Sequence, residues 1–411
     1  MRIARVSLFL LLGCTVSLGA QTFEQMTFIR PVDASASVRA AAMGATSGDD
    51  IAANPAALAD VKGPLFSFAA ARTEYRLTEI DFIDETTIGL VRHSADQTAL
   101  SHALAAVPVG GFVVSAYYRA NPALSSEQGF GGEGTEPYVP APCTVICGGY
   151  FITASPFKHR DVRYGAAGAW ERGAIAIGAG AELQELDERV DFTSIRTFSN
   201  DIPSSTFDRV VRRNSGRKIV PNASIRWRFA PRSALTAAYN GAGTFEATNS
   251  ACTLADPGTR DCTSVLATLS SSKQRMPDAY RLALSTGLTE RLQFVTEAVR
   301  RNYSNLTEEP EYGVNIPFAA PFRDVTEVHI GAEYRLPRVA LRAGWWTDPS
   351  HIANGYLPSY GFANTEDHLT VGAGIDVGQA RIDLAYDNTN DPGLRRASIG
   401  VSFGAPSLRG R

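Results

Sequence analysis

The chain has 411 residues, 44% of them hydrophobic, and its 39 basic and 42 acidic residues give a net charge of −3. This slightly acidic balance gives no indication of nucleic-acid binding. No run of eighteen or more apolar residues follows the first twenty, which excludes a helical membrane protein. An outer-membrane barrel remains compatible with the composition, because its strands need only one apolar face.

Residues 1–20 have the parts of a secretory signal peptide. Arg2 and Arg5 provide the positive start, residues 6–12 form the apolar run, and small residues follow at the exit. A lipoprotein signal ending at Cys14 is the alternative, but the apolar sequence continues past this cysteine. The sequence therefore predicts an exported protein.

Residues 37–61 differ in kind from everything downstream in the chain. They are rich in small residues, contain the acidic pair Asp49 and Asp50, and include the turn-forming pair Asn54-Pro55. Small residues let two backbones approach closely, so this composition predicts a compact segment that is not a strand. An ordinary surface loop with a short helix is the alternative.

The same stretch carries a resemblance to a known family. A small-residue run with Met43-Gly44, the acidic pair and Asn54-Pro55-Ala56 is similar to the N-terminal hatch of the long-chain fatty-acid transporter family of outer-membrane barrels. The resemblance implies a plug over residues 21–63, with an aromatic side chain near the mature N-terminus tucked into the barrel lumen. The plug and gate residues that it implies are Phe23, Gly44, Asp49, Asp50, Asn54, Pro55 and Ala56. The wider superfamily also includes secretion-associated barrels with a similar Asn-Pro-Ala segment, and this alternative stays open.

Downstream of residue 63, alternation at period two predicts β-strands. Six tight turns form hairpins, at 110–111, 172–173, 231–232, 290–291, 337–338 and 377–378. Long connections are expected at 78–97, 121–160, 191–215, 249–276, 305–323 and 349–365, although 86–91 leave a further strand open. With strands at 64–77 and 394–403 the count is fourteen. Short turns on one side and long loops on the other predict an all-β, antiparallel transmembrane barrel over 64–403, followed by a tail at 404–411.

Most of the predicted strands have one apolar and one charged face. In residues 326–336, Ile330 and Tyr334 alternate with Glu327 and Glu333. In a membrane barrel the apolar face meets lipid and the charged face lines the lumen. Charges of both signs can pair and rigidify the lumen, or an unpaired arginine can bind a ligand carboxylate with its planar fork. The candidates for this second role are Arg281, Arg226 and Arg335.

Aromatic residues near the predicted strand ends are typical of a membrane interface. They are Tyr117, Tyr118, Trp227, Phe229, Tyr303, Trp345, Trp346 and Tyr386. The last strand ends on Phe403, as in strands that the barrel assembly machinery recognises. Outer-membrane lipid and this machinery are therefore expected partners.

Four cysteines follow the signal in two close pairs, Cys143 with Cys147 and Cys252 with Cys262. In an oxidising compartment this pattern favours two local loop disulfides, although four cysteines allow three connectivities. Neither the cysteines nor the six histidines have the spacing of a metal site. No nucleophile arrangement typical of an enzyme is present. We expect no metal, no cofactor and no enzymatic activity.

Apolar residues also gather in the expected loops, at 138–157 and 316–322. Such a patch favours capture of a hydrophobic or amphipathic ligand, with packing of the loops over each other as the alternative. Together with the resemblance, it implies a passive channel in the bacterial outer membrane for hydrophobic or amphipathic small molecules such as long-chain fatty acids. A secretion-associated barrel that binds exported proteins and a structural barrel with a permanently closed plug are the alternatives.

Overall fold

The computed structural model describes residues 37–46, 50–76, 90–92, 94–120, 124–131, 150–153, 155–196, 206–254, 261–263, 267–305, 308–310, 323–349, 365–389 and 394–404. Phe23, Asp49, Cys143 and Cys147 lie outside these residues, as do the expected signal peptide and nearly all of the tail. The side chains of the two apolar loop stretches also lie outside the described set.

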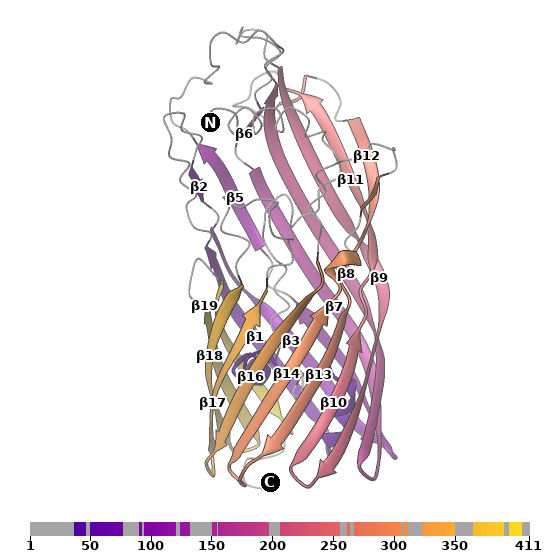
Figure 1. Ribbon diagram of the computed structural model, residues 1–411, viewed down its shortest axis with the longest axis vertical. Helices are drawn as coiled ribbons and strands as arrows, with labels where there is room; N and C mark the ends of the chain where they lie inside the picture. Colours follow the sequence, from indigo (N-terminus) through magenta and orange to yellow (C-terminus); the bar gives the residue numbers. More distant parts are fainter. Residues whose placement is uncertain are drawn as a thin grey trace, which may run out of the picture.

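Fourteen antiparallel strands close into a barrel (Figure 1). In order around the ring they are β1 (Leu65–Arg76), β3 (Ser94–Val109), β4 (Phe112–Ala120), β7 (Ser155–Arg172), β8 (Ile175–Arg196), β9 (Thr206–Ala230), β10 (Ser233–Asn240), β13 (Ala279–Gly287), β14 (Leu292–Arg301), β16 (Val325–Arg335), β17 (Val339–Asp348), β18 (Glu366–Val377), β19 (Ala380–Thr389) and β20 (Leu394–Phe403). Pairing of β1 with β20, which places Phe66 opposite Phe403, closes the ring. The predicted fold class and strand number are confirmed.

The six predicted tight turns all lie at one end of the barrel, called here the turn end, and they join consecutive strands of the ring (Figure 1). Gly110, Gly173 and Gly378 in three of these turns adopt φ angles of 63°, 61° and 64°. Glycine suits such left-handed positions because it has no Cβ to clash with the backbone. The opposite end, called the loop end, carries the longer connections.

At the loop end the structure corrects the predicted connections. Strand β8 runs on to Arg196 and β9 begins already at Thr206, both inside the connection expected at 191–215. Short strands also pair beside the ring strands or with one another in the expected loops (Figure 1). These are β2 (Leu90–Arg92), β5 (Leu124–Gly131), β6 (Tyr150–Thr153), β11 (Thr244–Thr253), β12 (Ala267–Arg275) and β15 (Glu308–Pro310). The sequence pattern missed these segments because their outward residues, such as Arg213 on β9, Glu246 on β11 and Lys273 on β12, are charged and form no apolar face. A disulfide between Cys252 and Cys262 holds the end of β11.

A belt of exposed apolar side chains surrounds the half of the barrel next to the turn end. Ile177 on β8, Trp227 on β9 and Leu369 on β18 are 47%, 52% and 57% exposed, while their strand neighbours in sequence point inward. Such a belt is the lipid-facing surface of a transmembrane barrel. No helix among the described residues is long and apolar enough to cross a membrane. Of the aromatic residues expected at the interface, Tyr117, Tyr303 and Trp346 are instead buried, because these side chains do not lie on the lipid-facing side.

Candidate functional site

The barrel encloses an inner segment, defined as residues 37–46 and 50–63. It contains helix α3 (Val38–Ala41), capped by the Ser37 hydroxyl, and the 3₁₀ helix η2 (Pro55–Asp60), which begins at a proline that needs no N–H partner there. Helix α3 contacts β18, β19 and β20, whereas η2 contacts β4, β7, β8 and β9 across the ring. The inner segment therefore bridges opposite walls of the barrel.

The first half of the inner segment, residues 37–46, packs backbone against backbone on the wall. A Cβ added to Gly344 would lie 2.3 Å from the Gly44 nitrogen, and one added to Gly331 would lie 2.3 Å from the Met43 carbonyl oxygen. Only glycine fits at such a separation. The Gly44 amide donates to the Thr370 hydroxyl at 3.1 Å. The wall is thus shaped to receive this half.

A buried charge network holds the same half. The Arg39 guanidinium donates to the Glu333 carboxylate, with an Nε–Oε2 distance of 3.0 Å. Glu333 also pairs with Arg335 and with Arg342, whose Nε lies 2.7 Å from Oε2. Glu333 is completely buried, so these ion pairs lie in surroundings where solvent screens charge weakly. The network joins α3 to β16 and β17.

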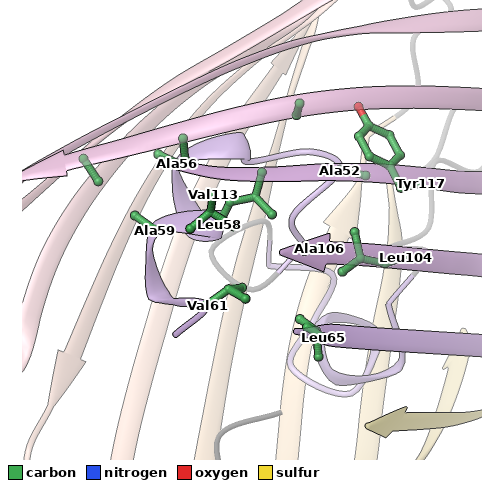
Figure 2. Packing of buried hydrophobic residues seen from close by; sticks show 13 residues of the cluster. Ala52, Ala56, Leu58, Ala59, Val61, Leu65, Leu104, Ala106, Val113 and Tyr117 are labelled. Carbon is green, nitrogen blue, oxygen red and sulfur yellow. The ribbon is translucent and has the colours of Figure 1, made fainter. Parts of the chain in front are cut away.

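The second half, residues 50–63, rests mainly on an apolar cluster (Figure 2). Leu58 is completely buried and belongs to one cluster with Val113 of β4 and Leu104 of β3. The other members are Ala52, Ala56, Ala59, Val61, Leu65, Ala106, Tyr117, Ala167, Ala169 and Ala176. Since most of these side chains are small, η2 comes close to the strands while burying little apolar area per residue.

Three wall side chains bond to the backbone of the second half. The Ser224 hydroxyl accepts from the Ala56 amide at 2.7 Å. The Asn222 side-chain amide donates to the Ala52 carbonyl at 3.1 Å. The Asn240 side-chain amide donates to the carbonyl of the next residue, at 3.3 Å. These are neutral hydrogen bonds, each with a net contribution of ~1 kcal/mol.

Asn54 is the exception in this half. Its side chain is completely buried, and neither its Nδ2 nor its Oδ1 has a hydrogen-bond partner within the part of the chain that the structure describes. An unpaired buried amide costs ~1–3 kcal/mol. The neighbouring Asp50 is buried and accepts from the Ala52 amide through Oδ1. Of the predicted plug residues, the inner segment thus contains Gly44, Asp50, Asn54, Pro55 and Ala56, and their role as a gate stays a prediction.

Below the second half, a cavity of ≈ 780 Å³ lies at the turn end of the barrel. Six basic and two acidic residues line it, among them Asp60 and Lys62 of the inner segment and Arg291 at a turn. The cavity therefore carries a positive charge excess. Of the three predicted ligand-binding arginines, Arg226 and Arg335 line it.

All three of these arginines have partners in the structure. Arg226 binds the Asp60 carboxylate with two contacts, of 2.6 Å and 3.0 Å. Arg335 donates to Gln293 at 2.6 Å and pairs with Glu333. Arg281 lies away from the cavity and donates to Asn240 at 3.1 Å. The alternative in which lumen charges pair and rigidify the barrel thus describes these residues, and ligand binding by them stays a prediction.

Sequence reasoning missed the anchoring role of Arg39 and Glu333, the contacts of Asp60 and the cavity itself. One available signal was the recurrence of glycine at inward positions of the last strands, such as Gly331 and Gly344, because an isolated glycine in a strand indicates close approach of another backbone. The partners of each charge depend on register across the barrel and carry no local signal.

Comparisons with models of protein families and with curated proteins find no match. Among solved structures, a FadL homologue of Pseudomonas aeruginosa is similar over 87% of this chain and 93% of its own, with a TM-score of 0.61 and 13% identity. The toluene transporter TbuX of Ralstonia pickettii is similar over 89% and 97%, with a TM-score of 0.56 and 15% identity. The Pseudomonas putida toluene transporter TodX is similar over 88% and 95%, with a TM-score of 0.53 and 16% identity. At these identities the likeness establishes a shared fold.

Proposed function

We propose that this protein is a passive channel of the bacterial outer membrane for hydrophobic or amphipathic small molecules, with the inner segment as its plug. The observation that carries the proposal is the inner segment, which bridges opposite walls of a transmembrane barrel through noncovalent contacts. The shared fold with two toluene transporters and a FadL homologue supports a hydrophobic cargo.

The plug opens in its second half. Residues 50–59 are held by small apolar side chains and neutral hydrogen bonds, and the buried side-chain amide of Asn54 has no partner among the described residues. At the more exposed end of this half, Asp60 pairs with Arg226 and Arg228, and these ion pairs must rearrange when the half moves. Moving this half gives that amide access to water and opens a route from the lumen to the cavity at the turn end. The charge network at Arg39 keeps the first half in place meanwhile. No energy input is needed, because the cargo moves down its gradient.

The cargo class that we propose is a long-chain fatty acid or a similar amphipath with an anionic head. Six of the eight charged residues that line the turn-end cavity are cations, and the Arg291 side chain has no ion pair among the residues that the structure describes. Arginine binds a carboxylate through two parallel hydrogen bonds. Arg291 and Arg335 therefore receive the head group as it leaves the lumen.

The same proposal fixes the orientation and export of the chain. The signal peptide at 1–20 directs export, and Phe23 enters the lumen ahead of the inner segment. The turn end faces the periplasm, as short turns do in bacterial barrels, and the loop end faces the exterior. The final strand, which ends on Phe403, engages the barrel assembly machinery.

Uptake measurements test the channel. In bacteria that lack their own fatty-acid channel, expression of the chain should restore uptake of radiolabelled oleate. Replacing Asn54 and Pro55 together should change that uptake while the barrel still assembles, as judged by its heat-modifiable mobility on gels. Normal uptake by an assembled double variant would contradict the plug as gate. An assembled wild-type barrel without uptake, purified together with exported proteins, would favour the secretion-associated alternative.

The cargo class is tested separately at the cavity. Arg291→Gln should lower oleate uptake several-fold and leave toluene uptake unchanged, because toluene has no charged head. Arg338→Gln is a matched control, since Arg338 is exposed at another turn and does not line the cavity. Equal loss of both cargoes in Arg291→Gln, or no loss of either, would exclude the proposed head-group contact. Lipid extraction and native mass spectrometry of the purified protein should then identify a bound fatty acid.

A further inference from the structure

Three potential metal ligands meet at the loop-end side of strands β17 and β18. Asp348 is the last residue of β17, and strand pairing places it opposite Glu366, the first residue of β18. His368 follows two residues later, on the same inward face. One ligand atom from each of the three residues lies within 4.8 Å of the other two.

The imidazole of His368 is oriented as a metal ligand. Its Nδ1 lies 3.0 Å from Oδ1 of Asp387, and a carboxylate can only accept, so Nδ1 carries the proton. Its Nε2 is left with a lone pair, has no hydrogen-bond partner among the described residues, and belongs to a side chain with 0% exposure. A histidine that donates one ring N–H to a carboxylate and presents the other nitrogen is the usual arrangement at protein metal sites. Buried polar atoms normally have a partner, and a bound metal ion would supply one for this nitrogen, which has none among the described residues.

We propose that Asp348, Glu366 and His368 bind one divalent transition-metal ion, with Asp387 as the residue that orients the imidazole. One nitrogen and two carboxylate donors suit zinc, which binds through such groups at ~2.1 Å. Ligand atoms on one zinc ion stand at most about 4.2 Å apart at that bond length. The two carboxylates close the remaining gap by rotating about their side-chain bonds.

Packing fixes the imidazole in this orientation. The Trp346 ring stacks on His368 with ring centroids 3.6 Å apart, and its Nε1 lies 3.4 Å from Asp387. Trp346 also forms a T-shaped contact with His329, at a ring-centroid distance of 5.5 Å, and His329 hydrogen-bonds to the Ala45 carbonyl of the inner segment. The proposed site is therefore joined through two rings to the first half of the inner segment.

The surroundings give the ion a way in. Leu369, on the outer face next to His368, is 57% exposed and marks the edge of the apolar belt. Glu366 is half-buried at the strand end, beyond this edge. An ion reaches the site from the aqueous loop end without crossing lipid. The sequence does not reveal this site. Glu366 and His368 are only two residues apart on β18, and Asp348 comes near them only because β17 pairs with β18.

Metal titration of the purified full-length protein tests the proposal. After removal of metals with EDTA, the protein in detergent should bind one zinc per chain, measured by calorimetry and elemental analysis. Cobalt should give the visible absorption bands of a nitrogen- and oxygen-ligated ion. His368→Gln and Asp348→Asn should each abolish stoichiometric binding, and Asp387→Asn should weaken it about 10- to 100-fold.

The matched control is Asp367→Asn, since Asp367 lies between two proposed ligands but points to the other face of β18. This variant should bind zinc as the wild type does. Heat-modifiable mobility verifies that each variant is folded, and Asp348→Asn replaces His368→Gln in the comparison if the latter does not assemble. Unchanged zinc binding by the folded ligand variants, or equal loss in Asp367→Asn, would overturn the site. Wild-type protein with much less than one zinc per chain at micromolar zinc would do the same.

Discussion

The two halves of the inner segment cross the same lumen but are held by different forces. Residues 37–46 lie at backbone-to-backbone separation from wall glycines and are tied to the buried Glu333 through Arg39. Residues 50–59 rest on small apolar side chains and neutral hydrogen bonds, and they include the unpaired amide of Asn54. At the more exposed end of this half, Asp60 forms ion pairs with Arg226 and Arg228. A close steric fit and a buried ion pair resist displacement more strongly than alanine contacts do.

The difference shows how the proposed plug could stay anchored at one half while the other half opens. A plug held equally along its length would release as a unit or not at all. Here the first half is held by both close fit and a buried carboxylate, while residues 50–59 of the second half are held by neutral hydrogen bonds worth ~1 kcal/mol each. The ion pairs that the second half makes through the half-exposed Asp60 and the exposed Lys62 lie at its end. We therefore expect the halves to respond differently to mutation, and each prediction below tests that asymmetry.

The largest effect is expected for Glu333→Gln. This change removes the carboxylate that Arg39, Arg335 and the completely buried Arg342 side chain share, and so takes one ion-pair partner from each of the three arginines. Breaking a buried ion pair in this way costs about 3–5 kcal/mol. Urea unfolding in lipid vesicles, followed by tryptophan fluorescence, should show this loss in the free energy of unfolding.

An exposed ion pair provides the control for that prediction. Glu290 pairs with Arg232 at 2.9 Å in adjacent turns, where the side chains are 80% and 49% exposed. Solvent screens such a pair, so Glu290→Gln should change the free energy of unfolding by at most ~1 kcal/mol. If the two variants lose equal stability, charge does not anchor the first half.

A smaller effect is expected for Gly344→Ala, which tests steric fit without altering charge. The added Cβ would lie 2.3 Å from the Gly44 nitrogen, so either the wall or the first half must move, at a cost of about 1–3 kcal/mol. Amide hydrogen exchange in residues 38–46 should become faster. Gly168→Ala is the matched strand control, because its Cβ would have only the Val113 carbonyl oxygen nearby, at 3.8 Å. Exchange that is unchanged in Gly344→Ala would refute the close fit.

The sequence predicts the barrel well because lipid imposes a rule on each strand. Residues such as Ile177 and Trp227 must face outward in alternation with polar neighbours, and this alternation is readable along the chain. A strand that extends beyond the lipid needs no apolar outer face, so its sequence shows no such alternation. For this reason the extensions of β8 and β9 were expected to be loops. Outward positions of the β9 extension carry polar residues such as Arg213 and Ser215, and only pairing with neighbouring strands reveals the extension.

The site is less predictable than the barrel because its contacts are long-range. The composition of residues 37–61 indicates a compact segment, and Gly44, Asp50, Asn54, Pro55 and Ala56 all belong to the inner segment. The partner of Arg39 lies 294 residues away in sequence, at Glu333, and nothing local distinguishes it from other lumen carboxylates. Which arginine pairs with which acid depends on the register of every strand between them.

The smallest effects are expected in the second half, and there two changes should have opposite signs. Ser224→Ala removes the acceptor of the Ala56 amide, so it loosens this half by ~1 kcal/mol. Asn54→Ala removes a buried amide that has no partner among the described residues, so it stabilises the closed position by a similar amount. Because ~1.4 kcal/mol is a factor of ten in an equilibrium, oleate uptake should rise several-fold in Ser224→Ala and fall several-fold in Asn54→Ala. Neither change should alter the global stability of the barrel as Glu333→Gln does. Changes of the same sign in both variants would show that the second half does not move as a unit, and the asymmetry between the halves would then have to be sought in the first half alone.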